Sequence, residues 1–444
     1  MKLKNAKCVR SAIFFAFMLI MGVLLSVPAV SALDDYGDGV GYFNNIQLSK
    51  GADEMHLTNL PLAQNYELVT VNPSLFATDA DSDKLAAVDI LGKEYLLELE
   101  PVSAPVAEDA KYIVINESGT FTLDPPYIQC YKGTVAGEPE SYAFFTVDNQ
   151  VILGTIRMGN MSYTIDQVGT VEVGGKRRIV HAIYDDNSVI DIKEPLESGI
   201  EVIPRLEGNE TIVHPSNEIM DPESVISSTT TVTFMGAHDQ QFRDLFPSPN
   251  SEITDMIAQV NTAFSTSDID VSLQISAYCD VGSTLSSYDS EDLLYEFKNE
   301  NSAFRDSTNS DIAVLFTGRD LDGDTIGSSF RCMPDSDYGY AHVQMCSGAG
   351  SYQATFSHRN INTAHEIGHL FGAGHEDSTA PYPSYAKAYH WKEWFTYDRY
   401  TALWSHFMGN DMRLEYSCDT KNGDASHDNA RRINEMKGYI AGYQ

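Results

Sequence analysis

The stretch HEIGHLFGAGH, residues 365–375, places three histidines, one glutamate and three glycines in eleven positions. Side chains four residues apart on a helix project from the same face, so His365 and His369 can approach one ion together. Gly372 stands where that helix has to end, because glycine tolerates the left-handed backbone of a sharp turn. The turn can bring His375 back as a third ligand. The stretch therefore predicts a helix with two ligands, a turn at Gly372, and a third ligand beyond it.

Three imidazole nitrogens and one open position are typical of a catalytic zinc ion, whereas a structural zinc is closed by four protein ligands. Glu366 follows the first ligand directly and can take a proton from a water held at the open position. Exposed or core histidines are the alternative reading, but chance rarely places five specified residues at these spacings. We therefore expect one zinc ion on His365, His369 and His375, with Glu366 as the catalytic general base.

The motif HExxHxxGxxH, as it stands in this sequence, resembles that of the metzincin zinc endopeptidases. DIAVLFTGRDLDGDTIGSSFRC and GDASHDNARRINEM are similar to segments of the reprolysin (adamalysin, M12B-like) branch, and CYKGTVAGEPESYAFFTV and RRIVHAIYDD to its propeptide. The resemblance implies a methionine in a tight turn beneath the metal, and LWSHFMGND places Met408 suitably, with Met412 as the weaker candidate. The chain departs from that branch at Leu370 and Glu376, and Asn410 leaves no tyrosine to serve as a fifth ligand.

The resemblance also implies the fold and the domain order. We expect a signal peptide at 1–32, a β-rich pro-domain at 33–205, a linker with the processing site at 206–230 and the zinc metalloprotease catalytic domain at 231–444. The catalytic domain is predicted to be α/β (α+β), with a mixed, mostly parallel sheet, an antiparallel edge strand and the active-site helix. Strands that alternate with helices after Thr231 independently favour an α/β domain.

Periodicity predicts individual elements of the second half. We expect strands at TVTFMGA (231–237), at 271–277 and at DIAVLF (311–316), and helices that begin at Ser251, at Ser290 and after Asp428. GYAHVQMC (339–346) is expected to be the edge strand above the metal, where it would bind an extended peptide by strand addition.

The N-terminus and the charge bear on location and partners. Four basic residues in MKLKNAKCVR precede an apolar run, and the segment ends in AVSA, which is typical of a secretory signal peptide. We therefore expect a secreted, extracellular protein without a membrane anchor, and a monomer. The formal net charge of −34 argues against nucleic acid, whose phosphates need a basic surface.

The cysteines and two acidic stretches suggest further sites. Four cysteines of the second half, Cys279, Cys332, Cys346 and Cys418, could form two disulfides in three alternative pairings. Cys130 remains, and its thiolate could occupy the open metal position and keep the enzyme latent; an inert or intermolecular thiol is the alternative. DLDGD (320–324) and DADSD (79–83) could hold Ca²⁺, although solvated turns are the simpler interpretation.

These features together predict a secreted zinc-dependent endopeptidase, made as a zymogen, that hydrolyses peptide bonds by attack of a zinc-bound water with Glu366 as the base. Its substrates would be proteins or peptides in extended form. Pro-region cleavage is expected between Glu207 and Thr231 in preference to the KRR stretch at 176–178. Two alternatives stay open: a non-catalytic extracellular binding protein on the same scaffold, and a zinc hydrolase of a non-peptide amide.

Overall fold

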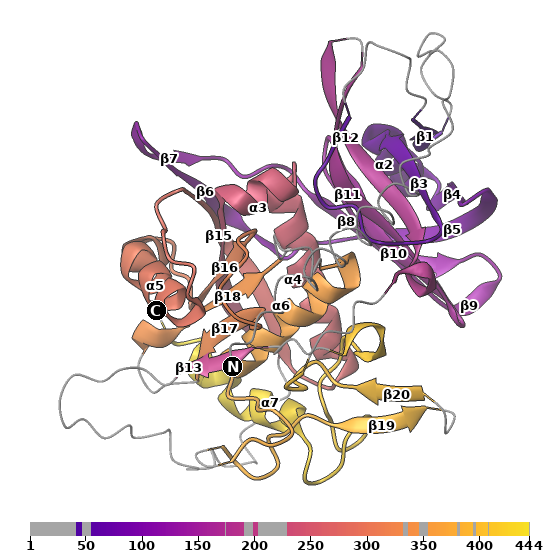
Figure 1. The fold of residues 1–444 in the computed structure, drawn as a ribbon. Coiled ribbons are helices and arrows are strands. Elements are labelled where there is room, and N and C mark those ends of the chain that lie inside the picture. The colour runs from indigo at the N-terminus through magenta and orange to yellow at the C-terminus, as the bar shows by residue number, and fades with distance from the viewer. Residues whose placement is uncertain are drawn as a thin grey trace, which may run out of the picture.

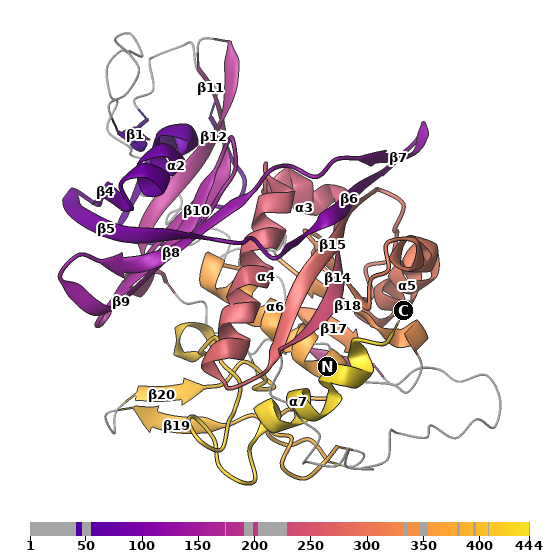
Figure 2. The ribbon, with the colours of Figure 1, turned by 180° about the vertical axis from the view of Figure 1, so that it is seen from behind.

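The two halves of the chain form two β-sheets that lie beside each other (Figures 1 and 2). The structure, a computed structural model, describes residues 41–46, 55–173, 175–190, 199–202, 229–331, 336–345, 354–379, 382–393, 397–406 and 408–443. We call the ten-stranded sheet the N-terminal sheet and the eight-stranded sheet the C-terminal sheet.

The N-terminal sheet is antiparallel throughout, as the alternation of apolar and polar residues predicts. Its strand order is β1-β3-β12-β11-β10-β9-β8-β5-β4, with β2 paired to β11. Helix α2 (Pro73–Ser82) packs against β4 and β5. The strands are β1 (Phe43–Asn45), β2 (Met55–Leu57), β3 (Tyr66–Val71), β4 (Leu85–Ile90), β5 (Lys93–Val102), β8 (Gln129–Val135), β9 (Glu138–Val147), β10 (Ile152–Met158), β11 (Met161–Val173) and β12 (Lys176–Asp185).

The C-terminal sheet is mixed and mostly parallel, in the order β13-β17-β18-β16-β14-β15-β6-β7. Its strands are β6 (Val106–Asn116), β7 (Gly119–Leu123), β13 (Ile200–Val202), β14 (Thr230–Asp239), β15 (Val271–Gly282), β16 (Ile312–Thr317), β17 (Gly327–Phe330) and β18 (Tyr340–Gln344). The helices are α3 (Gln240–Leu245), α4 (Pro249–Thr266), α5 (Ser290–Ser307), α6 (Phe356–Leu370) and α7 (Asn429–Ile440), and β19 (His390–Glu393) pairs with β20 (Tyr397–Tyr400) in a hairpin.

Both edges of the C-terminal sheet are supplied by the first half of the chain. The hairpin β6–β7 crosses over from the N-terminal sheet and pairs parallel to β15 at one edge (Figure 2). At the other edge β13 pairs parallel to β17. The first half is therefore interleaved with the second, which the predicted succession of two separate domains does not describe.

The central strands of the C-terminal sheet are buried on both faces because helices cover both. Ile312 and Val314 of β16 pack in the cluster that includes α4, α6 and α7, whereas Ala313 and Leu315 pack in the cluster that includes α5. Successive side chains of a strand point to opposite faces, so a doubly covered strand reads as a continuous apolar run. The run DIAVLF, predicted as a buried strand, has this environment.

A buried ion network joins the N-terminal sheet to the helices of the second half. Arg359 of α6 donates to Asp166 of β11 over 2.8 Å and to Glu252 of α4 over 2.7 Å. All three side chains are at most 1% exposed. Beside them Thr146 of β9 donates to Asp255 of α4 over 2.8 Å. The contact between the two halves thus has the burial of a protein core, and Arg359 is the cation that pairs with Asp166 and Glu252.

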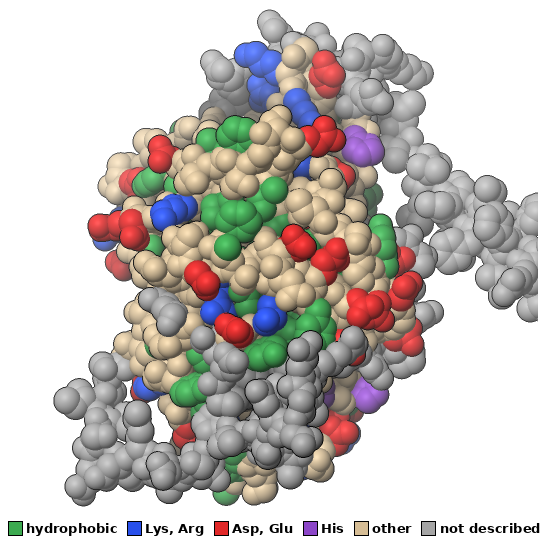
Figure 3. Space-filling view, turned by 90° about the vertical axis from the view of Figure 1, so that its left-hand side faces the viewer, with side chains coloured by type: hydrophobic (Ala, Val, Ile, Leu, Met, Phe, Trp, Pro, Cys, Tyr) green, Lys and Arg blue, Asp and Glu red, His purple; other side chains and the backbone are tan. Residues whose placement is uncertain are grey.

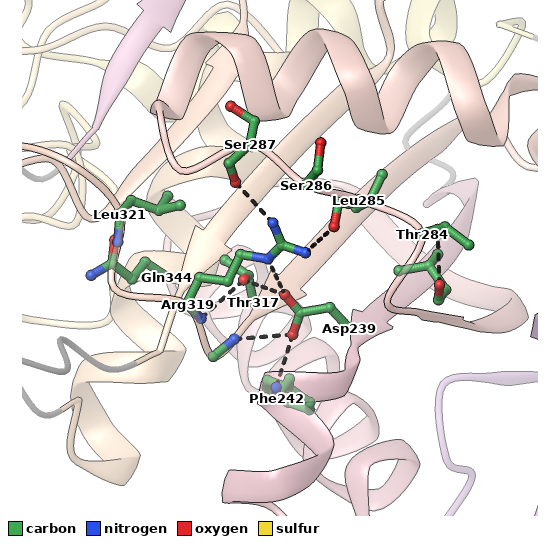
Figure 4. Close-up of polar contacts among 12 residues, drawn as sticks. Asp239, Phe242, Thr284, Leu285, Ser286, Ser287, Thr317, Arg319, Leu321 and Gln344 are labelled. Carbon is green, nitrogen blue, oxygen red and sulfur yellow. Dashed lines mark hydrogen bonds and ion pairs between the residues drawn. The ribbon is translucent and has the colours of Figure 1, made fainter. Parts of the chain in front are cut away.

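A second buried pair fixes the loop that leads to β17. Arg319 donates from Nε to Asp239 over 3.0 Å, and its terminal nitrogens donate to the carbonyls of Leu285 and Ser287 (Figure 4). Asp239 also accepts from the backbone N–H of Phe242, which caps α3. Because unpaired buried charges are costly, this network holds the ends of β14 and β16 and the loop after β15 in one arrangement.

Three predictions about elements are wrong. Ser251 does not cap α4 but lies inside it, because Pro249 occupies the first helical position, which suits proline. The Ser251 hydroxyl donates to Asp148 of the N-terminal half. GYAHVQMC contains β18, which lies between β16 and β17 and is no edge strand; β17 is its antiparallel neighbour. DADSD does not form a separate turn, because it continues α2 with Asp83 as its C-cap.

Nothing among the described residues resembles a membrane span, since no helix there is both long enough and apolar enough to cross a bilayer. On the face shown in Figure 3, acidic side chains gather along one margin, and the basic side chains are few and dispersed. This face therefore offers no basic surface of the kind that binds nucleic acid.

Candidate active site

Helix α6 carries the first part of the histidine motif and ends as the sequence predicts. Thr355 is its N-cap, where the hydroxyl accepts from the N–H of His358 over 3.3 Å. At the other end Gly372 has φ +78°, a left-handed conformation that glycine adopts without strain. The backbone N–H of Gly372 donates to the carbonyl of His369 over 2.8 Å. The turn at Gly372 therefore redirects the chain toward His375.

The structure brings the three predicted ligands together. The Nε2 atoms of His365 and His369 are 2.9 Å apart, and each lies 3.1 Å from Nε2 of His375. His365 Nδ1 is 2.7 Å from the carbonyl of Ala402, and His369 Nδ1 is 2.9 Å from that of Ala373. These carbonyls accept the Nδ1 protons, which leaves the Nε2 lone pairs directed at one shared point.

This arrangement fits a zinc ion. Three nitrogens at ~2.0–2.1 Å from a tetrahedral zinc lie roughly 3.3 Å from one another, close to the separations of the histidine cluster. Burial and the neighbouring imidazoles hold the pKa of His365 and of His369 well below the usual range, so both stay in the neutral, metal-binding form. Among the described residues, these three form the one group of potential ligands large enough for a metal ion.

Glu366 lies beside the cluster in a site that excludes water from its carboxylate. Its side chain is fully buried, and neither carboxylate oxygen has a partner at full hydrogen-bond geometry in the described part of the chain. Burial raises the pKa of Glu366 well above its ordinary value, and the charge of Glu201 adds to the increase. The nearby hydroxyl of Ser329 lowers the pKa of Glu366, but by less than burial raises it. An unsatisfied buried carboxylate at this position is suited to hold a polar reactant and to exchange a proton with it.

A short segment of the first half covers this site. We call Gly199–Val202 the cleft segment; its residues 200–202 form β13 against β17. A Cβ atom on Gly199 would lie 2.2 Å from Glu366 Oε1 and 3.0 Å from His365 Nε2, and one on Gly327 of β17 would lie 2.4 Å from Glu366 Oε1. The two glycines therefore let both backbones approach the carboxylate, and the cleft segment occupies the space in front of it.

Glu201 is the charged residue that the cleft segment brings to the histidines. Its Oε1 is 3.3 Å from His369 Nδ1 and has no hydrogen-bond partner within the described ranges. Its Oε2 accepts from Arg331 Nη2 over 2.7 Å and from Nε over 3.1 Å. The carboxylate thus has one oxygen held by an arginine and one left at the histidine cluster.

Cys130, for which a latency ligand was one of two hypotheses, lies elsewhere. It is in β8, 1% exposed, and packs with Phe144 and Ala258 between the N-terminal sheet and α4. Its thiol is 3.8 Å from the hydroxyl of Thr146, and burial raises its pKa to about 12. A thiol that is protonated and enclosed in this way cannot serve as a metal ligand without leaving its strand, so the structure does not support the latency role.

Met408 directly precedes a 3-10 turn, Gly409–Asp411, whose Asp411 N–H donates back to the Met408 carbonyl over 3.2 Å. The side chain packs against the core cluster that also contains Ala364 and Ile367 of α6. The expected tight turn is present, and a place beneath the metal stays a prediction.

The structure does not support the disulfide and calcium predictions. Cys279 and Cys418 are free, buried thiols in different core clusters, so neither forms a predicted disulfide; Cys332 and Cys346 lie outside the described residues. Neither acidic stretch gathers three metal-ligating groups where the structure describes it, and calcium has no support. The signal peptide at 1–32 lies outside the described residues, as does all but the end of the predicted linker at 206–230.

Sequence reasoning missed Gly199, Glu201, Gly327 and Arg331. None of them stands in a motif, because their role depends on which strand pairs with β17. A Gly and a Glu spaced as in GIEV are too common to signal a site.

Comparisons with known proteins complete the description. Residues 228–399 match the family model Reprolysin_5, described as metallo-peptidase family M12. The solved metalloproteinase-II from Bacteroides fragilis is similar at 13% identity, over 79% of this chain and 90% of that chain, with a TM-score of 0.41. A chain in a structure of a chaperone–substrate complex is similar at 13% identity over 49% of this chain, with a TM-score of 0.38; the match spans 35% of that chain's length. No curated protein matches in sequence.

Proposed function

We propose that the chain is a secreted zinc endopeptidase made as a zymogen, because residues 228–399 match the model of metallo-peptidase family M12. The observation that carries the proposal is the convergence of three neutral histidine nitrogens within 3.1 Å, beside a buried carboxylate without a partner in the described residues. His365, His369 and His375 would hold the zinc ion.

Zinc, when bound, supplies Lewis-acid polarisation of the scissile carbonyl and lowers the pKa of a nearby water. Glu366 would accept a proton from that water and pass it to the departing amine, a role that its place directly after the first ligand on α6 allows. β17 offers its backbone to an extended peptide once the cleft segment has left, because β17 would then be the edge of the sheet. Binding through the backbone would tolerate many sequences.

The position of the cleft segment supports synthesis as an inactive precursor. Gly199 lies against Glu366 and His365, and β13 takes the edge of β17 where a substrate strand would pair. The segment runs parallel to β17, and its chain continues toward the predicted cleavage region between Glu207 and Thr231. Removal of the segment is therefore the step that would open the site.

Digestion of a denatured protein by the zinc-loaded chain, after cleavage of its linker, tests the proposal. We expect Glu366→Gln to retain one zinc per chain and to lose at least about 100-fold in rate, the usual contribution of a general base. His369→Ala should lose both zinc and activity, and a chelator should abolish cleavage reversibly. N-terminal sequencing of the protein in the culture medium would locate both processing sites.

Two outcomes would favour a different function. A fully metallated chain, freed of the cleft segment, that cleaves nothing would favour an extracellular binding protein. Hydrolysis of small acyl amides without cleavage of any peptide would favour a different zinc hydrolase.

A further inference from the structure

Arg331 makes a contact with Glu201 that resembles ligand recognition. Two guanidinium nitrogens, Nε and Nη2, donate to the same carboxylate oxygen over 3.1 and 2.7 Å. The arginine side chain is 17% exposed and the glutamate 9%, so the pair is largely removed from water. Hydrogen bonds between charged partners in such surroundings are among the stronger ones in proteins.

The second half of the chain holds Arg331 in position without help from Glu201. Arg331 directly follows β17, and its guanidinium carbon is 4.5 Å from the centre of the Tyr382 ring. Stacking on an aromatic ring orients a guanidinium and limits the rotamers it visits. Departure of the cleft segment would therefore leave a cation at the rim of the site, in a protein with a formal net charge of −34.

The contact belongs to a strand that lies where substrate is expected. Glu201 is opposite Ser329 in the β13–β17 register, and the N–H of Arg331 donates to the carbonyl of Val202 over 3.1 Å. Arg331 thus contacts a side chain of the strand that lies along β17. A guanidinium recognises a carboxylate by its own planar geometry, so a strand of either direction can supply the acid.

We propose that Arg331 forms a carboxylate-binding subsite of the cleft, which Glu201 fills in the intact chain and an acidic side chain of a bound peptide fills afterwards. The substrate part of this inference rests on the proposed peptidase function, whereas the binding part does not. The ligand class is an extended peptide with Glu or Asp at the residue that faces Arg331.

The test uses the full-length chain with its cleft opened. Gly199→Leu displaces the cleft segment, because even a Cβ there meets Glu366 Oε1 at 2.2 Å, and Glu201→Ala empties the Arg331 contact. Glu366→Gln keeps the bulk of that side chain and prevents turnover. The probes are labelled peptides SGIEVI and SGIQVI, and the readout is their dissociation constants by fluorescence anisotropy, with zinc and with chelator.

We expect the glutamate peptide to bind about tenfold tighter or more, the effect of hydrogen bonds to a charged group. Adding Arg331→Ala should reduce the ratio to within twofold. Arg399→Ala is the matched control, because Arg399 is 14% exposed, donates to Glu393 over 2.7 Å and stacks on Tyr397, away from the histidines. It should leave the ratio unchanged.

Two binding results would overturn the inference. A glutamate preference that survives Arg331→Ala would place the recognition elsewhere, and one that disappears with chelator would assign it to the metal. Equal binding of both peptides to the chain that carries Gly199→Leu, Glu201→Ala and Glu366→Gln would also overturn the inference.

Cleavage of a peptide mixture by the chain with Glu366 intact tests the substrate part. A preference for Glu or Asp at one position of the cleaved peptides, lost in Arg331→Ala, supports the subsite. Cleavage without such a preference contradicts the substrate part. If no peptide is cut, the peptidase proposal fails, and the anisotropy ratios still decide the binding part.

Discussion

The first half of the chain contacts helix α6 at both of its ends, and the two contacts are built differently. At the start of α6, Arg359 is enclosed by Asp166 and Glu252, and Phe356 packs with Val151 and Ile179 of the N-terminal sheet. Near the other end, Gly199 of the cleft segment lies against His365 and Glu366. Both contacts leave some carboxylate oxygens without a partner in the described residues, but they differ in their charges. Arg359 is paired with two carboxylates at the start of α6, whereas Glu366 has neither of its oxygens hydrogen-bonded in the described part of the chain.

The difference distinguishes the contact that contributes to stability from the contact that serves the histidine site. A buried network in which one arginine neutralises two carboxylates is costly to break, since removing the arginine leaves both carboxylates without their cation. A site with unsatisfied polar atoms is less stable than it could be, and such atoms commonly mark a place for another ligand. We therefore expect the start of α6 to control folding and its end to control access.

The largest effect is expected at the start of α6. Arg359→Ala leaves Asp166 and Glu252 buried without their cation and should lower the free energy of unfolding by ~3–5 kcal/mol. Urea denaturation measures this loss. Arg399→Ala, which breaks a more exposed pair, should cost no more than about 1 kcal/mol. A loss at Arg359 as small as that at Arg399 would remove the distinction between the two contacts.

The same interface should respond to pH. Burial, followed by the charge of Glu252, raises the pKa of Asp255 to about 8, whereas an unfolded aspartate has its ordinary value of 3.8. Between these two values the folded state holds the extra proton, so its stability is fully present below about pH 4 and is lost as the pH rises through about 8.

The free energy of unfolding should therefore decrease from pH 5.5 to 8, by at most about 1.4 kcal/mol per pH unit for this group. Urea denaturation of the parent chain and of Asp255→Asn at both pH values measures the contribution. The asparagine variant should show the shallower dependence. Equal slopes would mean that Asp255 is ionised in the folded state.

A smaller effect on stability than at Arg359 is expected at the cleft. Glu201→Ala removes the ion pair with Arg331 and should change the free energy of unfolding by about 1–2 kcal/mol. Access should change more: a labelled hydroxamate should bind the unprocessed, zinc-loaded variant at least tenfold tighter than the parent chain. Glu393→Ala serves as the control with an equivalent arginine partner. If the probe binds the parent equally well, the cleft segment does not restrict access.

Local sequence patterns were enough for the parts of the site that lie close together in the chain. The i, i+4 spacing of His365 and His369 needs only a helix, and Gly372 needs only a turn, so both follow from backbone geometry. The capping of α7 by Asp428, whose side chain accepts from the N–H of Arg431, is equally local. The buried strand β16 is apparent in its continuous apolar run.

Contacts between distant segments could not be foreseen in this way. Three features of the C-terminal sheet depend on pairing between strands that are far apart in the sequence: β18 lies inside the sheet, β6–β7 is inserted at one edge, and β13 pairs at the other. The residues of a single strand do not indicate its partner. Cys130 was expected at the metal because thiolates bind zinc, yet its burial against α4 was decided by how the two halves pack.

The sequence by itself determined the histidine cluster, its neighbouring carboxylate and the turn between them, because these features require only the periodicity of a helix and the freedom of glycine. The tertiary structure decided what lies against that cluster. Glu201 and Arg331 meet because two strands pair side by side, and Arg359 is neutralised because β11 and α4 converge on it. Such meetings arise from the packing of whole elements, which no short stretch encodes.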